Sequence, residues 1–73
     1  MLIKMNCVDS LLNLEHYAQV MRSGTKIMLY NSRGTVSVCV YDGEKATEEF
    51  KRLMVAIANS DMLFWFSGDE IEA

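Results

Sequence analysis

The pattern of apolar and polar positions between residues 25 and 41 is that of a β-hairpin. Two apolar runs rich in β-branched residues, at about 25–30 and 35–41, flank the polar segment Asn31-Ser32-Arg33-Gly34. Asn at the first position and Gly at the fourth suit a type I turn, and glycine adopts positive φ without strain. The pattern therefore predicts an antiparallel pair of strands in the middle of the chain.

The length of this loop decides which side chains share a face of the sheet. A four-residue loop places Ile27 and Leu29 on one face with three valines, whereas a three-residue loop closed by a Gly bulge places them on opposite faces. We expect the four-residue loop, because it gives one continuous aliphatic face that includes Val36, Val38 and Val40. The second face is then mixed and partly solvated, and carries Lys26, Met28, Tyr30, Thr35, Ser37, Cys39 and Tyr41.

The N-terminal part of the chain carries a weaker alternation. Residues 2–8 alternate loosely and run into Asp9-Ser10, which is typical of a strand followed by a turn. The next segment, 11–22, fits two readings. Ser10 and Gly24 could cap a helix, which mildly favours a short helix in which four residues recur at helical spacing: Leu11, Leu14, Ala18 and Met21. Its second half also alternates and ends at Ser23-Gly24, where a second hairpin turn would lead into Thr25.

After Asp42 the spacing of the apolar residues changes from a period of two to a period of 3.6 residues, which predicts an amphipathic helix over about 44–59. Asp42 or Gly43 can cap its start, and the acidic residues of the first turns complement its dipole. The expected core stripe consists of Ala46, Phe50, Leu53, Met54, Ile57 and Ala58.

An apolar tail at 62–66, three of whose five residues are aromatic, follows the helix. It precedes an acidic segment at 69–72. Five consecutive apolar residues are unfavourable in water, and the three aromatic rings together bury several hundred Å² (about 150–250 Å² each) when packed. We favour an added edge strand in the chain's own sheet; the alternative is docking on a second copy or on another protein.

Composition bounds the size of the core. The chain has 73 residues, of which 51% are hydrophobic, and it lies near the lower limit for a single self-sufficient core. Such an apolar small chain packs densely or leaves surface for a partner, which raises the prior for homo-oligomers. No apolar run approaches the roughly 18 residues of a membrane span, and residues 1–4 lack the features of a secretion signal. We expect a soluble cytoplasmic protein without a membrane partner.

Charge is distributed unevenly around the net value of −3. Residues 1–40 carry +2 and residues 41–73 carry −5. The cations of the first half, Lys4, Arg22, Lys26 and Arg33, are scattered without a basic cluster, which is a poor electrostatic footprint for nucleic acid.

Residues with catalytic or metal-binding chemistry are few. Cys7 and Cys39 are far apart and form no CxxC pair, and a single histidine, His16, gives no metal-ligand spacing. Both cysteines suit small buried hydrophobes. His16 with Glu15 and Cys7 could form a Cys–His pair, but a lone histidine near a turn is usually a surface residue. No phosphate-binding or nucleophile motif occurs. We expect no metal, no cofactor and no enzyme activity.

A resemblance bears on the ambiguous segment. It rests on four parts of the sequence: the run from Leu11 to Val20, the run from Thr25 to Leu29, the valine strand after Gly34, and Thr47-Glu48-Glu49-Phe50. Over roughly residues 2–58 this pattern, with Asn13-Leu14, resembles the short bacterial and phage-borne proteins related to the small flagellar protein FlbD. The resemblance implies a corner at Leu14-Glu15-His16, a strand from Tyr17 to Met21 and no catalytic residues. The aromatic tail extends beyond the family's usual pattern.

Together these elements predict an α+β fold in a single domain, 1–73. We expect an antiparallel β-meander of four to five strands, with one C-terminal amphipathic helix packed on one face and the tail as an extra edge strand. The strands are expected at about 2–8, 11–13, 17–22, 25–30 and 35–41.

Surplus apolar surface on so small a chain favours a non-catalytic module that binds another protein or itself. The resemblance implies that it is encoded by a bacterium, a phage or a mobile element. The candidate partner interface consists of Met62, Leu63, Phe64, Trp65, Phe66, Met28, Tyr30 and Tyr41. The alternative is a nucleic-acid-linked regulator in which the four N-terminal cations gather on one sheet face.

Overall fold

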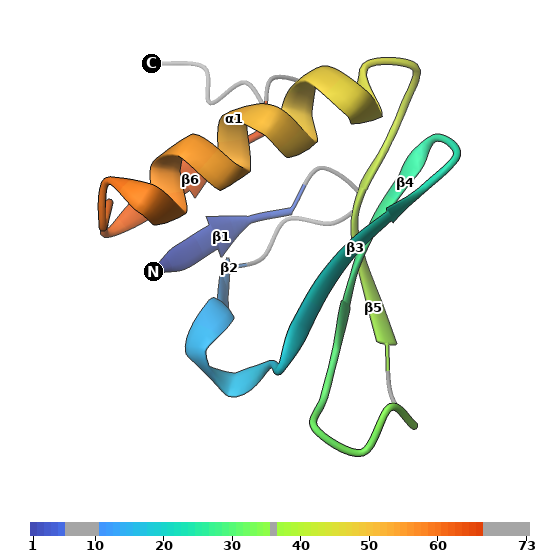
Figure 1. Ribbon diagram of the computed structural model, residues 1–73, viewed down its shortest axis with the longest axis vertical. Coiled ribbons are helices and arrows are strands. Elements are labelled where there is room, and N and C mark those ends of the chain that lie inside the picture. Colours follow the sequence, from blue (N-terminus) through green and yellow to red (C-terminus); the bar gives the residue numbers. More distant parts are fainter. Residues whose placement is uncertain (6–10, 36, 67–73) are drawn as a thin grey trace.

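Two small sheets and one helix make up the structure, a computed structural model that describes residues 1–5, 11–35 and 37–66. Figure 1 shows the helix lying over the first sheet, with the longer hairpin strands to one side. The elements are β1 (Leu2–Lys4), β2 (Leu11–Asn13), the 3₁₀ turn η1 (Leu14–His16), β3 (Gln19–Ser23), β4 (Lys26–Tyr30), β5 (Ser37–Asp42), α1 (Ala46–Ala58) and β6 (Leu63–Trp65).

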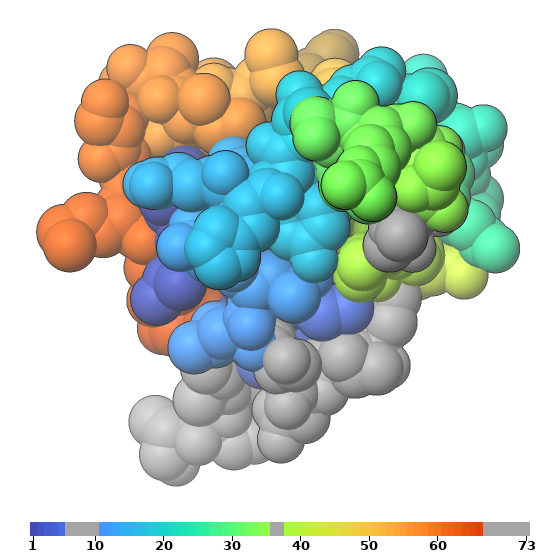
Figure 2. Space-filling model, turned by 90° about the horizontal axis from the view of Figure 1, so that it is seen from below, coloured from blue at the N-terminus to red at the C-terminus, as the bar shows by residue number. Residues whose placement is uncertain are grey.

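The first sheet has the strand order β2-β1-β6 and joins the two ends of the described chain. β1 pairs antiparallel with β2 and parallel with β6, with Ile3 opposite both Leu12 and Phe64. In the space-filling view from below, orange C-terminal residues lie against the blue N-terminal ones (Figure 2). The apolar tail is thus an edge strand of the chain's own sheet, as we favoured, and its parallel direction is the new observation.

The ambiguous segment is strand, corner and strand rather than a single helix. The Asn13 side chain accepts a hydrogen bond from the Glu15 N–H at 3.0 Å and caps η1. The Tyr17 N–H closes the turn on the Leu14 carbonyl, and β3 follows from Gln19. This corner separates β2 from β3, so the five N-terminal strands divide between two sheets. The expected corner at 14–16 is confirmed, and the expected strand begins two residues later than predicted.

The second sheet, β3-β4-β5, is an antiparallel meander. Gly24 has φ +60 in the two-residue turn between β3 and β4, which is the position that requires glycine in a type II′ turn. The next turn is the expected type I-like one, because the Gly34 N–H donates to the Asn31 carbonyl at 3.0 Å. The ladder, however, starts with Tyr30 opposite Ser37 instead of Thr35.

A β-bulge in β5 changes which side chains reach the core. Met28 is opposite Cys39 and Ile27 is opposite Tyr41, so Val40 is the extra residue between the two pairs. In a regular strand Val40 and Tyr41 would point to opposite faces, but the bulge shifts the alternation and both are buried. The placement of Tyr41 on the second, solvated face is therefore wrong.

Helix α1 lies over the first sheet, and the face that it turns toward the core differs from the predicted one. Ala46 and Leu53 are buried as predicted and Phe50 is half-buried. Glu49 and Ala56 also face inward, whereas the predicted core residues Met54, Ile57 and Ala58 are exposed. The helix is thus rotated relative to the predicted stripe. Its bounds, 46–58, agree with the expected 44–59 to within two residues.

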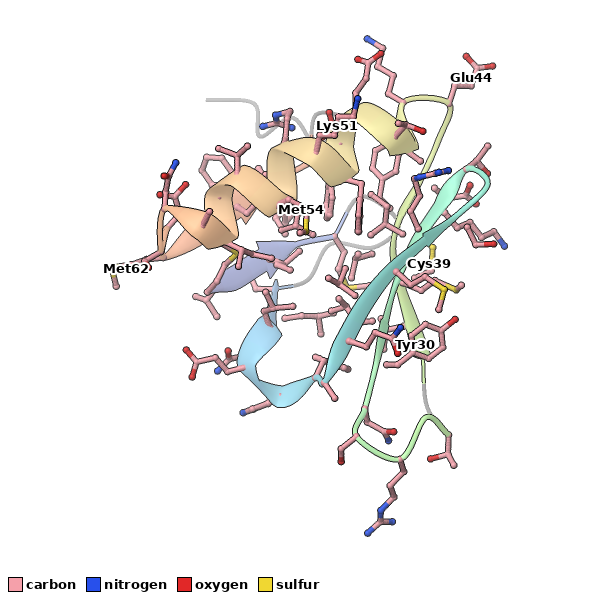
Figure 3. The ribbon with its side chains drawn as sticks, in the orientation of Figure 1. Tyr30, Cys39, Glu44, Lys51, Met54 and Met62 are labelled. Atoms are coloured by element: carbon pink, nitrogen blue, oxygen red, sulfur yellow. The ribbon has the colours of Figure 1, made fainter. Side chains whose placement is uncertain are left out.

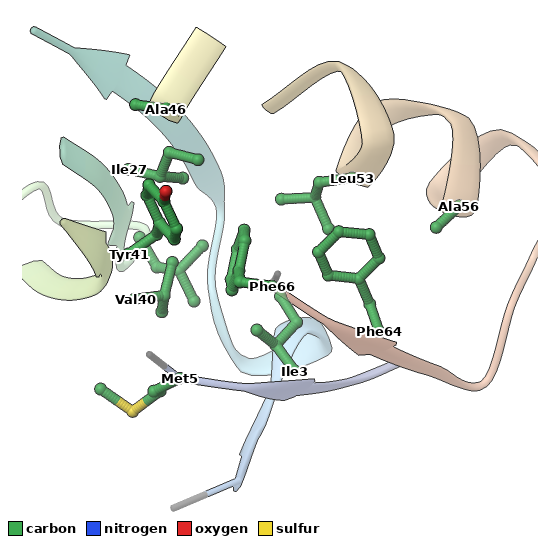
Figure 4. Close-up of a cluster of buried hydrophobic side chains, with 11 residues drawn as sticks. Ile3, Met5, Ile27, Val40, Tyr41, Ala46, Leu53, Ala56, Phe64 and Phe66 are labelled. Atoms are coloured by element: carbon green, nitrogen blue, oxygen red, sulfur yellow. The ribbon is translucent and has the colours of Figure 1, made fainter. Parts of the chain in front are cut away.

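The core lies where α1 meets both sheets. Phe66 packs between Tyr41 and Phe64, with ring centroids 5.3 Å and 4.9 Å apart (Figure 4). Leu53 and Ala56 cover these rings from α1, and Ile3 and Val40 contribute from the two sheets. The α+β fold with a meander and one C-terminal helix is confirmed. The end of the predicted 2–8 strand, Cys7 and Val36 lie outside the described residues.

Candidate interaction surface

Strand β6 divides the apolar tail into an inward and an outward set. Phe64 and Phe66 are 6% and 1% exposed, so these two members of the predicted interface belong to the core. Leu63 and Trp65 point to the other face and are 41% and 45% exposed. Met62 precedes the strand, is 85% exposed and projects from the end of the molecule (Figure 3). Three of the five tail residues therefore remain available to a partner.

The outer face of the first sheet continues this apolar surface. Pairing places Leu2 beside Leu63, in a row with Asn13. The next row runs from Leu11 through Lys4 to Trp65. Leu2 and Leu11 are 42% and 52% exposed, so the sheet presents four half-exposed apolar side chains around the Lys4 stem. Isolated exposed hydrophobes are ordinary on a protein surface, but a contiguous group indicates an interface.

A groove of about 510 Å³ carries the surface from β6 onto the flank of α1. Val55, which is 60% exposed, lines this groove together with Leu63 and Trp65. Lys51 and Asp61 are its exposed charged residues apart from Arg52. We call this the α1–β6 groove.

Arg52 closes the inner wall of the α1–β6 groove. It forms an ion pair with Glu49, whose side chain is 3% exposed, and its guanidinium lies 5.0 Å from the centre of the Phe64 ring. It also donates a hydrogen bond of 3.3 Å to the Trp65 carbonyl. The edge of β6 is therefore occupied at Trp65, which disfavours the addition of another strand there.

A second groove of about 560 Å³ lies at the start of β1. Met62, Leu2 and Ile57 contribute its apolar lining. The Met1 ammonium group lies 3.6 Å from the Glu15 carboxylate, and both residues line this groove. Met1 and Glu15 thus pair with each other here, and Asp61 lines this groove as well.

The six residues Leu2, Leu11, Val55, Met62, Leu63 and Trp65 form what we call the apolar band. Five of them are connected by a strand pairing or a shared groove. Leu11 joins them through Lys4, which pairs with Leu11 on one side and with Trp65 on the other. They are six of the nine exposed large hydrophobic side chains of the described residues. The sequence identified the three tail residues but missed Leu2, Leu11 and Val55. Alternation marks the two leucines once the sheet order is known, and Val55 lies outside the stripe that the 3.6 period selected.

The other predicted interface lies on the outer face of the meander. Met28, Tyr30 and Cys39 share this face and are half-buried, and Figure 3 shows Tyr30 and Cys39 on the side away from α1. The Tyr30 hydroxyl lies 3.9 Å from the Met28 sulfur. This face is separate from the apolar band and less exposed, with Met21 at 36% as its one large exposed hydrophobe within the described part.

The four cations of the alternative hypothesis are dispersed. Arg22 is opposite Ile27 and Lys26 opposite Ser23, which places the two cations on opposite faces of the meander. Arg33 is in the turn at the far end of β4, and Lys4 belongs to the first sheet, where its ammonium donates to the Met5 carbonyl. A continuous basic surface does not result from this arrangement.

Groups with catalytic or metal-binding chemistry are not clustered in the described ranges. No set of three or more His, Cys, Asp or Glu residues is placed to hold a metal ion in residues 1–5, 11–35 and 37–66. His16 is exposed in η1, and Cys39 is half-buried on the outer face of the meander, where its thiol donates a hydrogen bond of 3.3 Å to the Tyr41 carbonyl. In the same ranges, no helix has the length and apolar character needed to span a membrane.

Comparison with protein families, with characterised proteins and with solved structures finds no match to this chain. The resemblance to the FlbD-related proteins therefore stays a prediction.

Proposed function

We propose that this chain is a non-catalytic protein-interaction module that works by burying the apolar band against another protein chain. The observation that carries the proposal is the grouping of six exposed apolar side chains across β2, β1, β6 and α1, with Lys4 between Leu11 and Trp65. Transfer of such a surface from water into an interface favours binding by about 25 cal/mol per Å² of apolar area buried. The partner is this chain itself or another protein.

A regulator that binds nucleic acid has less support. Affinity for a polyanion depends on several cations that contact phosphates together. The separation of Arg22, Lys26 and Arg33 on different faces and ends of the meander argues against such a site. We further propose that the module acts in the cytoplasm.

Site-specific photo-crosslinking in the cell that encodes the protein tests the proposal. A photo-reactive phenylalanine analogue replaces Trp65 in one variant and Ser32, an exposed residue of the distant hairpin turn, in the control. Position 65 is expected to give discrete protein adducts and position 32 none. Equal yields at both positions, or no adducts at position 65, would rule out the apolar band as a protein-binding surface.

A further inference from the structure

The α1–β6 groove holds two exposed charges of opposite sign that have no ion-pair partner among the described residues. These are Lys51 on the outer side of α1 and Asp61 beyond its C-terminal end. Val55 lies between them in sequence, four residues after Lys51 and therefore about 6 Å along the helix axis. The free charges of the groove thus sum to zero, although the chain as a whole carries −3.

This charge layout is self-complementary. In a two-fold dimer every contact occurs twice, so a residue near one end of a patch meets the residue at the other end of the same patch on the second copy. A patch that carries one sign of charge repels its own copy. The α1–β6 groove instead presents a cation toward one end and an anion toward the other, with Val55, Leu63 and Trp65 as its exposed apolar residues.

We propose that the partner of the α1–β6 groove is a second copy of this chain, related by a two-fold axis that passes near Val55. Lys51 of each copy then faces Asp61 of the other, and Trp65 and Leu63 pack across the axis. This inference rests on the proposed function and specifies its partner. Because Arg52 occupies the Trp65 carbonyl, the contact is made by side chains rather than by a strand added to β6.

The size of the surface sets the expected strength of association. A standard interface covers about 800 Å² per partner, which is about a sixth of the 4889 Å² surface of this chain. The lining of the α1–β6 groove exposes less than that, which corresponds to the smaller, transient class of interfaces. A dimer with a micromolar dissociation constant is therefore expected.

Sedimentation equilibrium from micromolar to millimolar concentration tests this inference on the full chain. Val55→Glu and Trp65→Ala are expected to abolish the dimer. Met54→Glu is the matched control, because Met54 is also exposed on α1 but lies outside the groove. Figure 3 shows Met54 and Lys51 on different sides of the helix. Far-UV circular dichroism checks that each variant remains folded.

A charge exchange tests the two-fold geometry itself. Lys51→Asp and Asp61→Lys each place like charges in contact twice and are expected to weaken the dimer at least about tenfold. The double variant restores opposite charges and is expected to return to within about threefold of the original affinity. A double variant that stays as weak as the singles contradicts the Lys51–Asp61 contact.

Other results separate this inference from the proposed function. A chain that remains monomeric at millimolar concentration overturns the second copy as partner, as does a dimer that survives both Val55→Glu and Trp65→Ala. If position 65 then still crosslinks to a different protein, the proposed function stands with another partner. If position 65 crosslinks to nothing, both fail.

Discussion

Glu49 is the one charged residue that is buried within the described part of the chain, and its burial requires compensation. Its side chain is 3% exposed and forms an ion pair with Arg52, which is half-exposed at the surface of α1. Burying an ionised group is costly unless a partner and hydrogen bonds compensate it. Arg52 also contacts the Phe64 ring and the Trp65 carbonyl, so it links the helix to β6 while it neutralises Glu49.

Removal of the Arg52 guanidinium is expected to destabilise the protein more than an ordinary surface change. Arg52→Met removes the guanidinium that pairs with the buried Glu49 carboxylate, and we expect the free energy of unfolding to fall by about 1–3 kcal/mol, with solvent at the exposed guanidinium limiting the loss. Urea denaturation measures this. The double variant Glu49→Met/Arg52→Met is expected to recover most of the loss, because no buried charge remains. Equal stability of Arg52→Met and the original chain would mean that the ion pair contributes nothing.

Gly43 is the second residue whose identity the packing requires. A Cβ atom at this position would lie 2.7 Å from the hydroxyl oxygen of Tyr41 and 3.0 Å from the ring carbon that carries it. Tyr41 is buried, so its ring has little room to move.

Gly43→Ala is therefore expected to lower the free energy of unfolding by about 1–3 kcal/mol through overpacking. Thermal or urea unfolding measures the change. The loss is expected to shrink in a Tyr41→Phe background, where the closest atom is absent. The same loss in both backgrounds would show that the strain does not come from the tyrosine hydroxyl.

At the scale of elements, strand β6 divides one apolar run into core residues and surface residues, because successive side chains of a strand point to opposite faces. The sequence shows five apolar residues in a row, and a period of two cannot be seen in a run without polar positions. Pairing with β1 decides the matter by placing Phe64 opposite the buried Ile3. Phe66 then enters the core and Trp65 stays at the surface.

Substitution of neighbouring aromatic residues in this segment is expected to have opposite kinds of effect. Phe66→Ala removes a buried ring from between Tyr41 and Phe64 and is expected to cost about 3–5 kcal/mol of stability. Trp65→Ala is expected to cost less than about 1 kcal/mol, because its ring is half in water. Comparative urea unfolding of the two variants provides the measurement. A reversed order would mean that β6 faces the other way.

Helix α1 and the meander mark the limits of prediction from sequence. Period and turn residues located the helix and the hairpin turn at 31–34, because these signals are local. The turn at Ser23-Gly24 was only one of two readings of its segment, and the resemblance favoured it. The rotation of α1 was not accessible, since apolar residues occur on several sides of the helix and Met54 and Ala56 compete for the core. The bulge at Val40 and the inclusion of Tyr41 in the core depend on packing against Phe66, which is distant in sequence.

At the scale of the whole molecule, the apolar band results from the covering of only one face of the first sheet. One helix of 13 residues covers the inner face of the first sheet, and within the described residues no second helix covers its outer face. Leu2, Leu11, Leu63 and Trp65 are left half-exposed in consequence. A small chain of high apolar content thus forms a one-sided core, and a partner can supply the missing layer.

The fold as a whole is expected to depend on β6. A chain that ends after Ser60 loses the strand beside β1 together with Phe64 and Phe66, which are core residues. We expect such a chain to lack cooperative thermal unfolding and the dispersed amide resonances of a packed protein. A truncated chain with a sharp unfolding transition would show that the meander and α1 form a core without β6.

The parallel pairing of β1 with β6 also sets an order of events during synthesis. β1 is made first and its parallel neighbour about sixty residues later, so the first sheet is completed only after residues 63–65 have left the ribosome. The β3-β4-β5 meander needs contacts of short sequence separation, which form quickly. Until β6 arrives, β1 has one unpaired edge and the nascent chain is open to wrong pairings. Strand β1 is thus translated before the meander but belongs to the sheet that closes after it.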